Sequence, residues 1–299
     1  MEIIYKDIVV KKPRPKQTIY SYLKMNGYSE NYLKNLRREL GFIKLNGDIC
    51  LCNAIVNDGD VISTNVNPNT KTSICSCIIP LDVVYEDDEV IAVNKPSMLP
   101  TMPSRSHFTH NLSGALVGYM EDKQLNFVVR IVNRLDKEAS GIVLACKDSL
   151  SSNFLNKEEN TKKVYYALCT GNLEKDVVID KNIETLLNDD GYNYNKRATS
   201  DIGGKSAKTT VSVVKNFDGY CLVKITLNHG RTHQIRVHME SIGHPLLGDI
   251  LYGESSPLIS HTALVCKELQ FVHPKTKEIV KLSVPFPDDF NKLISGYEV

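Results

Sequence analysis

Short apolar segments separated by tight turn signals recur along the second part of this chain, and they limit its fold to a sheet-based one. The predicted strands are a pair within 81–96, single strands at 141–145 and 164–169, a hairpin of 209–214 with 221–227, and a last hairpin turning at 274–277. Helices are predicted over 149–158 and 232–241, and loops over 176–205, which shows no periodicity. Hairpin-paired strands with few helices between them predict an α+β fold with a mixed, mostly antiparallel sheet.

The N-terminal part has a different pattern, in which two short helices precede a hairpin. Apolar residues at helical spacing predict one helix that stops at Gly27, a good C-cap residue. Ser29 is the predicted N-cap of a second helix, which includes Leu40 and ends at Gly41. Asn46-Gly47 then marks a tight hairpin turn.

Basic residues gather in this N-terminal part, although the formal net charge of the 299 residues is only +1. Ten lysines and arginines between Lys6 and Lys44 stand against three acidic residues. Charge alone favours a solvated helix face, but a basic lobe on a neutral chain is also typical of an RNA-binding surface. The polar stretch 66–78 predicts a linker between domains at 1–65 and 79–299.

A short polar turn, Asn133–Gly141, leads directly into the apolar run Ile142–Ala145. Asp136 therefore lies at the mouth of a sheet, with Arg134 beside it. An aspartate in a turn is most often a cap or a turn former. Here a second motif, Gly230–His238, offers cations that could pair with its carboxylate.

Together the two motifs resemble the catalytic motifs of the RluA-type RNA pseudouridine synthases. That family carries H-R-L-D-x-x-T-S-G where this chain has 133–141, and the chain departs from it at Asn133 and Ala139. Residues 230–238 match G-R-T-H-Q-I-R-x-H, and 243–249 match G-H-P-L-x-G-D. The resemblance implies a catalytic domain of the pseudouridine synthase type that isomerises uridine in RNA, a reaction that needs no redox or group-transfer cofactor.

The resemblance also implies roles for individual residues. Asp136 would be the nucleophile, and one arginine would pair with it, hold it ionised and fix its aim; we favour Arg236 over Arg231. Tyr165, in a K-x-Y-x-A pattern, would stack under the target uracil, and strand alternation would turn its neighbour Tyr166 away. Arg134 would enter the RNA stack that the target nucleotide leaves. Attack at the sugar, attack at the base and elimination all remain open.

The N-terminal helices and hairpin resemble the small alpha-L RNA-binding motif, which implies RNA contacts by Lys34, Arg37 and Arg38. Arg231 is a further candidate for binding RNA. The expected partner is a structured RNA, and we favour large-subunit ribosomal RNA over transfer RNA.

Several kinds of site are not expected. Neither a secretory signal nor a membrane-spanning stretch is evident, so we expect a cytoplasmic protein whose eight cysteines are reduced. The C-x-C pairs Cys50/Cys52 and Cys75/Cys77 are interpreted as buried or half-buried structural thiols rather than zinc ligands. We expect no metal, no cofactor, no nucleotide-binding motif and a monomeric chain.

Two other functions fit parts of the sequence. A non-catalytic RNA-binding protein could keep the same fold, but it would be expected to lose the aspartate or its arginine. A glycoside hydrolase would need two carboxylates flanking the bond, and Glu138 is the nearest partner for Asp136. Residues so close in one turn seldom oppose each other across a substrate.

Overall fold

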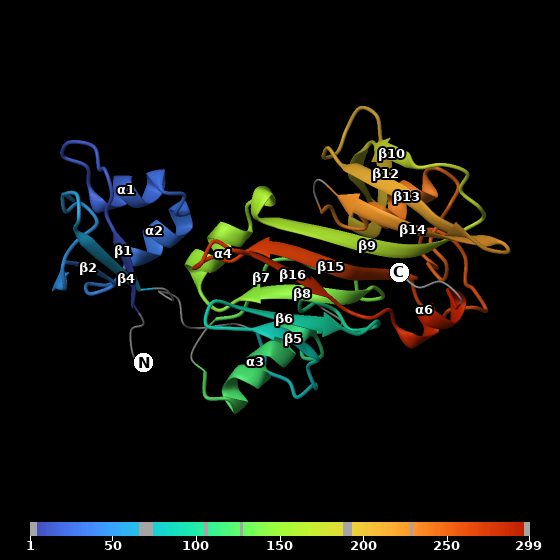
Figure 1. The fold of residues 1–299 in the computed structure, drawn as a ribbon, viewed down its shortest axis with the longest axis horizontal. Helices are drawn as coiled ribbons and strands as arrows, with labels where there is room; N and C mark the ends of the chain where they lie inside the picture. Colours follow the sequence, from blue (N-terminus) through green and yellow to red (C-terminus); the bar gives the residue numbers. More distant parts are fainter. Residues whose placement is uncertain are drawn as a thin grey trace.

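The computed structural model describes residues 5–65, 74–104, 107–125, 128–187, 193–227 and 230–295. Residues 5–65 form an N-terminal unit, and the other described residues form a larger unit around a ten-stranded sheet (Figure 1). The core of the N-terminal unit also includes Leu150 of the larger unit. Among the described residues, no helix has both the length and the apolar character needed to cross a bilayer.

The N-terminal unit packs two helices against a four-stranded sheet of order β1-β4-β2-β3. Its elements are β1 (Tyr5–Val9), α1 (Ile19–Met25), α2 (Glu30–Leu36), β2 (Ile43–Leu45), β3 (Asp48–Ile49) and β4 (Val61–Asn65). The hydroxyls of Thr18 and Ser29 cap the two helices, accepting hydrogen bonds from Ser21 N and Tyr32 N at 3.2 Å each. The predicted N-cap at Ser29 is therefore confirmed.

The second helix is shorter than predicted. It ends at Leu36, and Leu40 is 76% exposed rather than part of the core. Tight turns follow the helix, and Gly41 at φ +98° then directs the buried Phe42 into the core. Arg37 and Arg38 consequently follow the helix instead of lying along it.

The sheet of the larger unit has the order β10-β13-β14-β9-β15-β8-β6-β5, with β16 paired to β15 and β7 to β8. Its strands are β5 (Val83–Glu86), β6 (Val90–Lys95), β7 (Arg130–Ile131), β8 (Ser140–Cys146), β9 (Thr161–Thr170), β10 (Val177–Asp180), β13 (Lys208–Asn216), β14 (Tyr220–Leu227), β15 (Leu264–Val272) and β16 (Ile279–Ser283). All pairs are antiparallel except β15 with β8. The expected mixed α+β sheet is confirmed.

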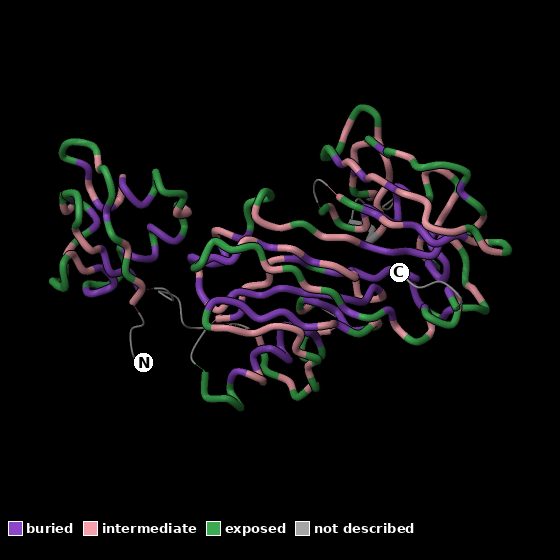
Figure 2. The backbone as a smooth tube through the Cα atoms, viewed as in Figure 1, coloured by how far each residue is buried: buried purple, intermediate pink, exposed green. Residues whose placement is uncertain are grey.

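Helices and one small sheet complete the larger unit. They are α3 (Leu112–Asp122), α4 (Ser149–Leu155), the single 3₁₀ turn η1 (Glu158–Asn160), α5 (Gln234–Glu240), α6 (Asp288–Leu293) and the hairpin of β11 (Asn182–Leu187) with β12 (Asn193–Ser200). Figure 2 shows the buried backbone concentrated along the middle strands, and all of β8 is buried. This buried centre carries the loop between β7 and β8.

The loops predicted over 176–205 are wrong, because β10, β11 and β12 lie there. β10 has only four residues, and in β10 and β11 the side chains of Ile179 and Ile183 are buried. The backbone pairing of β11 with β12 is therefore not visible as a hydrophobic period. The helices predicted over 149–158 and 232–241 are also shorter, since α4 ends at Leu155 and α5 begins at Gln234.

The predicted linker 66–78 lies partly outside the described residues, which resume at Ile74. From there the chain already packs on the larger unit. Ile74 contacts the main core, and Cys77 N donates to Gly114 O at 3.0 Å on α3. The larger unit therefore includes part of the segment predicted as linker.

Candidate active site

The loop between β7 and β8 carries Asp136. Hydrogen bonds hold it at Asn133 and at Leu135, the two neighbours of Arg134. The buried Asn133 amide donates to Ile142 O at 2.9 Å and accepts from Leu144 N at 2.8 Å. The hydroxyl of Thr101 donates to Leu135 O at 2.6 Å and accepts from Leu135 N at 3.1 Å. Asn133, where the family motif has histidine, thus ties the loop to β8.

Lys95 braces the other end of this loop. It is fully buried at the end of β6, and its Nζ donates to four carbonyl oxygens: Ala139 at 2.5 Å, Pro96 and Leu99 at 2.8 Å each, and Lys137 at 3.3 Å. Burial lowers the pKa of Lys95 to about 7, and the charge of Asp136 opposes that shift. Sequence reasoning missed this residue, whose signal is a lysine that ends an apolar strand just before a proline.

Gly141 lets the loop enter the sheet. It has φ +108°, and a Cβ there would lie 2.3 Å from Cys266 O on β15. A side chain at this position would therefore prevent β8 from pairing with β15.

Arg236 on α5 is the electrostatic centre of the site, with a side chain only 3% exposed. Its Nε and Nη2 each lie 2.7 Å from one carboxylate oxygen of the fully buried Asp249. Nη2 is also 3.2 Å from Glu138, and Nη1 is 3.4 Å from Asp136 Oδ2. Burial alone would lower the pKa of Arg236, but these three carboxylates raise it above its ordinary value.

The second motif builds this arrangement through its backbone. Buried Gln234 accepts from Arg231 N at 2.9 Å and donates to Lys208 O at 3.0 Å, which fixes the start of α5 against β13. Gly248 has φ +70°, and a Cβ there would lie 2.3 Å from His261 O. The tight turn at this glycine places Asp249 beside Arg236. The role of Asp249 was not assigned from the sequence, although it lies within the matched motif.

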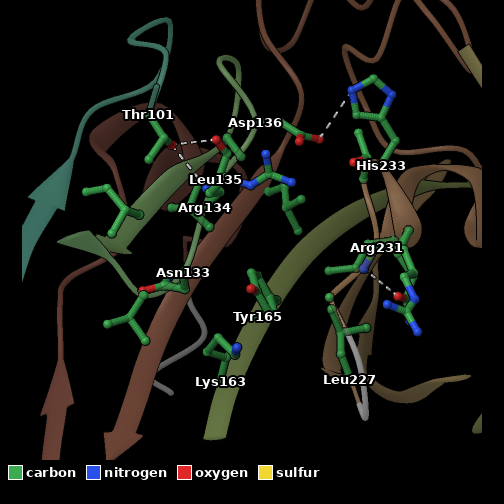
Figure 3. Close-up of a pocket in the computed structure, with 18 of the residues that line it drawn as sticks. Thr101, Asn133, Arg134, Leu135, Asp136, Lys163, Tyr165, Leu227, Arg231 and His233 are labelled. Atoms are coloured by element: carbon green, nitrogen blue, oxygen red, sulfur yellow. Dashed lines mark hydrogen bonds and ion pairs between the residues drawn. The ribbon is translucent and has the colours of Figure 1, made fainter. Parts of the chain in front are cut away.

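His233, the N-cap residue of α5, lies with its Nε2 4.0 Å from Asp136 Oδ2 (Figure 3). It has φ +57°, and its Nδ1 lies 3.1 Å from the hydroxyl of Tyr252. Burial lowers the pKa of His233, against the opposing charge of Asp136. The imidazole is therefore neutral near pH 7.

Asp136 is 26% exposed and faces a cavity of about 610 Å³. Tyr165 and Lys163 on β9 also line the cavity (Figure 3). Burial raises the pKa of Tyr165 well above its ordinary value, so its phenol stays protonated. Tyr166 belongs to a different core cluster, where its ring meets Phe286 edge-on at 5.3 Å. As alternation predicts, only the first tyrosine faces the cavity.

The remaining predicted residues are distributed between the cavity and the N-terminal unit. Arg134 is exposed and lines the cavity. Arg231 also lines it, but its Nε donates to Ser206 O at 3.2 Å, so Arg236 is the arginine that contacts Asp136. Lys34, Arg37 and Arg38 are exposed on the N-terminal unit and do not line the cavity. The structure thus brings Asp136, Arg236, Tyr165, Arg134 and Arg231 together at one cavity.

Comparison with known proteins agrees with this arrangement. Residues 89–241, which include all of these cavity residues, match the family model described as RNA pseudouridylate synthase. The chain belongs to the RNA pseudouridine synthase family. It is therefore an isomerase that acts on RNA.

Individual relatives of this pseudouridine synthase extend the comparison over most of the chain. It is 35% identical over 256 residues to ribosomal large subunit pseudouridine synthase D of Neisseria meningitidis serogroup A, covering 79% of this chain and 67% of the relative. It is 29% identical over 288 residues to the uncharacterized RNA pseudouridine synthase YjbO of Bacillus subtilis, covering 93% and 99%.

A solved structure shows a similar fold. Human RNA pseudouridylate synthase domain containing 1 superposes with a TM-score of 0.55 at 24% identity, covering 69% of this chain and 83% of that one.

The two C-x-C pairs of this pseudouridine synthase lie in different parts of the structure. Cys50 and Cys52 belong to the N-terminal unit, whereas Cys77 packs against α3. Cys75 is exposed, so its interpretation as a buried or half-buried thiol is wrong; the chain around it lies on the outside of α3 instead of in a strand. Within the described part of the chain, no three histidine, cysteine or acidic side chains come together as metal ligands.

Proposed function

We propose that Asp136 is the nucleophile of this pseudouridine synthase. The observation that carries the proposal is its position between a buried cation and the open cavity. Of the three carboxylates around Arg236, only Asp136 lines the cavity, while Asp249 and Glu138 occupy the remaining guanidinium nitrogens. Arg236 thus favours an ionised, oriented carboxylate, which a nucleophile needs at neutral pH.

The reaction breaks the bond from uracil N1 to ribose C1′, forms a bond from C5 to C1′, and releases the C5 hydrogen as a proton. N1 takes up a proton from solvent in place of the one lost at C5. The net change is therefore an isomerisation without redox or group transfer, and the proposal requires no cofactor. We place the uracil on the ring of Tyr165, which holds the base while it turns. Arg134, at the exposed edge of the cavity, would fill the space that the flipped nucleotide leaves.

The position of Glu138 argues against glycoside hydrolysis. Its carboxylate contacts the same arginine as Asp136 and accepts from Thr262 Oγ1 at 3.2 Å, away from the cavity-lining set. Two carboxylates on one guanidinium do not flank a substrate bond.

We further propose that the substrate is a structured RNA, with large-subunit ribosomal RNA favoured over transfer RNA. The Neisseria relative is a ribosomal large subunit pseudouridine synthase, which supports this choice. The exposed Lys34, Arg37 and Arg38 would supply sequence-independent contacts to phosphates, with residues 1–65 acting as an RNA-binding domain of the alpha-L type. The proposal needs only one copy of the chain.

Tritium release from RNA labelled at uridine C5 tests the nucleophile. Wild-type protein should release tritium from total RNA of cells lacking this protein, and Asp136→Asn should release none. The variant should keep its RNA affinity, because the substitution removes a charge without changing shape. Release at the wild-type rate by Asp136→Asn would overturn the assignment.

Chemical mapping of pseudouridine tests the substrate. Ribosomal and transfer RNA fractions from the same cells would be treated separately, and new pseudouridines located by carbodiimide adducts. Modification confined to transfer RNA would contradict the ribosomal choice without affecting the assignment of Asp136.

A further inference from the structure

A second pocket, of about 190 Å³, lies where the N-terminal unit meets α4 and the turn before β16. We call it the junction pocket. Its lining comes from three parts of the chain: β1 with the α1–α2 turn, α4 with Lys157 two residues beyond its end, and the turn at Pro274–Lys277. In Figure 1, α4 is the part of the larger unit nearest to α2.

Three lysines from the three segments line this pocket: Lys6, Lys157 and Lys277. Lys6 joins the two units, since its Nζ lies 2.9 Å from Glu89 and 3.5 Å from Asp148. Its charge is therefore compensated within the protein.

The other two ammonium groups lack such compensation. Lys157 Nζ lies above Gly27, where a Cβ would approach it to 2.8 Å, and it has no hydrogen-bond or ion-pair partner within the described ranges. Lys277 Nζ donates to Pro274 O at 2.6 Å and lies 3.7 Å from the centre of the Phe154 ring. All three lysines line the one pocket, and partial burial together with the charges of Lys6 and Lys157 lowers the pKa of Lys277.

The one acidic residue in the lining does not neutralise these two lysines. Asp7 accepts a hydrogen bond from Ser63 Oγ at 2.6 Å within the N-terminal sheet, and no ion pair joins it to Lys157 or Lys277 in the described structure. Two uncompensated cations converging on a small concave site attract an anion.

The junction pocket adjoins the active-site cavity through a single stretch of chain. Leu155, Asn156 and Glu158 line the cavity, whereas Phe154 and Lys157 line the junction pocket. Lys157 is thus flanked in the chain by two cavity-lining residues, and an RNA strand that leaves the cavity over this segment would meet the lysines.

We propose that the junction pocket binds a backbone phosphate of the RNA substrate, so that one RNA is held against both units while its uridine occupies the cavity. Lysine suits this task because its compact charge needs no fixed geometry at the phosphate. The proposal relies on RNA as the substrate of the family and does not depend on Asp136 being the nucleophile.

The salt dependence of RNA binding by Lys157→Gln/Lys277→Gln tests the proposal. The full-length variant should bind a substrate RNA roughly tenfold more weakly at low salt. The slope of log K against log salt should fall by about one, the amount expected for one lost phosphate contact. Tritium release at saturating RNA should keep the wild-type rate, whereas Asp136→Asn should show the opposite pattern.

Two matched variants complete the test. Lys157→Arg/Lys277→Arg keeps both charges and should restore affinity, while Lys292→Gln removes an exposed charge on α6, at the far end of the molecule from α2 (Figure 1), and should change nothing. The two substituted lysines, Lys157 and Lys277, are exposed, so the glutamine variant should fold with an unchanged melting temperature. A glutamine variant with the wild-type salt slope would overturn the proposal.

Discussion

Arg236 and the lysines of the junction pocket are cations used in opposite ways. The guanidinium is 3% exposed and three carboxylates occupy its nitrogens, whereas Lys157 is exposed and has no such partner among the described residues. A buried charge must be neutralised internally because water cannot solvate it. Such a charge can orient a neighbouring carboxylate, but it has little capacity left for a ligand. The solvated lysines can exchange water for a phosphate at small cost.

Removal of the buried cation, Arg236, should have the largest effect. Arg236→Met should leave Asp249 buried without its partner and lower the free energy of unfolding by about 3–5 kcal/mol. Tritium release should also disappear, because Asp136 loses its orientation. Urea unfolding and the release assay measure the two effects. A variant with wild-type stability would show that Asp249 does not depend on this arginine.

Lys95 is an intermediate case, since its buried ammonium is satisfied by carbonyl oxygens rather than by carboxylates. Lys95→Met should lower the free energy of unfolding by about 1–3 kcal/mol through the unpaired carbonyls. It should also reduce activity, because the loop of Asp136 is loosened.

The pH dependence of the free energy of unfolding tests the lowered pKa of Lys95. Its pKa is about 7 in the folded protein and 10.5 ordinarily, so the unfolded chain binds more protons between these values. Wild-type stability should therefore rise with pH across this window, and the rise should be smaller in Lys95→Met. Parallel curves for the two proteins would contradict the shift.

A smaller effect is expected from adding a proton to the cluster. Because the pKa of His233 is lowered below 6.5, its contribution to stability is complete above pH 6.5 and is lost as the pH falls through the folded value. Urea unfolding between pH 7.5 and 5 should show a steeper loss for wild type than for His233→Asn. His238, whose pKa is also lowered, is present in both proteins and cancels. If stability fell equally with pH in both proteins, the pKa of His233 would not be lowered in the folded state.

The sequence predicted those parts of the molecule that depend on local pattern. The strand after Asp136 could be found because it is a continuous apolar run after a polar turn, and the hairpin around Asp218-Gly219 because turn residues separate two apolar segments. The β11–β12 hairpin could not, since its strands pair through the backbone and bury little. The family motif pointed to Asp136 and Arg236.

The partners of these site residues lie beyond what a motif reveals. Thr101, Lys95 and Asp249 reach the loop or the arginine only after distant segments have folded together. The place of Lys95 before a proline and of Asp249 in a matched motif therefore does not say what each side chain contacts. The burial of Arg236 was likewise not predictable from the sequence, because it results from the packing of α5 against β13 and against the turn that carries Asp249.

The place of β15 in the sheet has a consequence for biosynthesis. Residues 264–272 form the strand between β8 and β9, which carry the loop of Asp136 and the ring of Tyr165. A growing chain that has passed residue 236 already contains every proposed catalytic residue, yet the two halves of the cavity have no strand to join them. Their open edges are exposed to other chains during that interval. Competence should therefore appear only after β15 has left the ribosome, and truncation before Leu264 should abolish activity while every proposed catalytic residue remains.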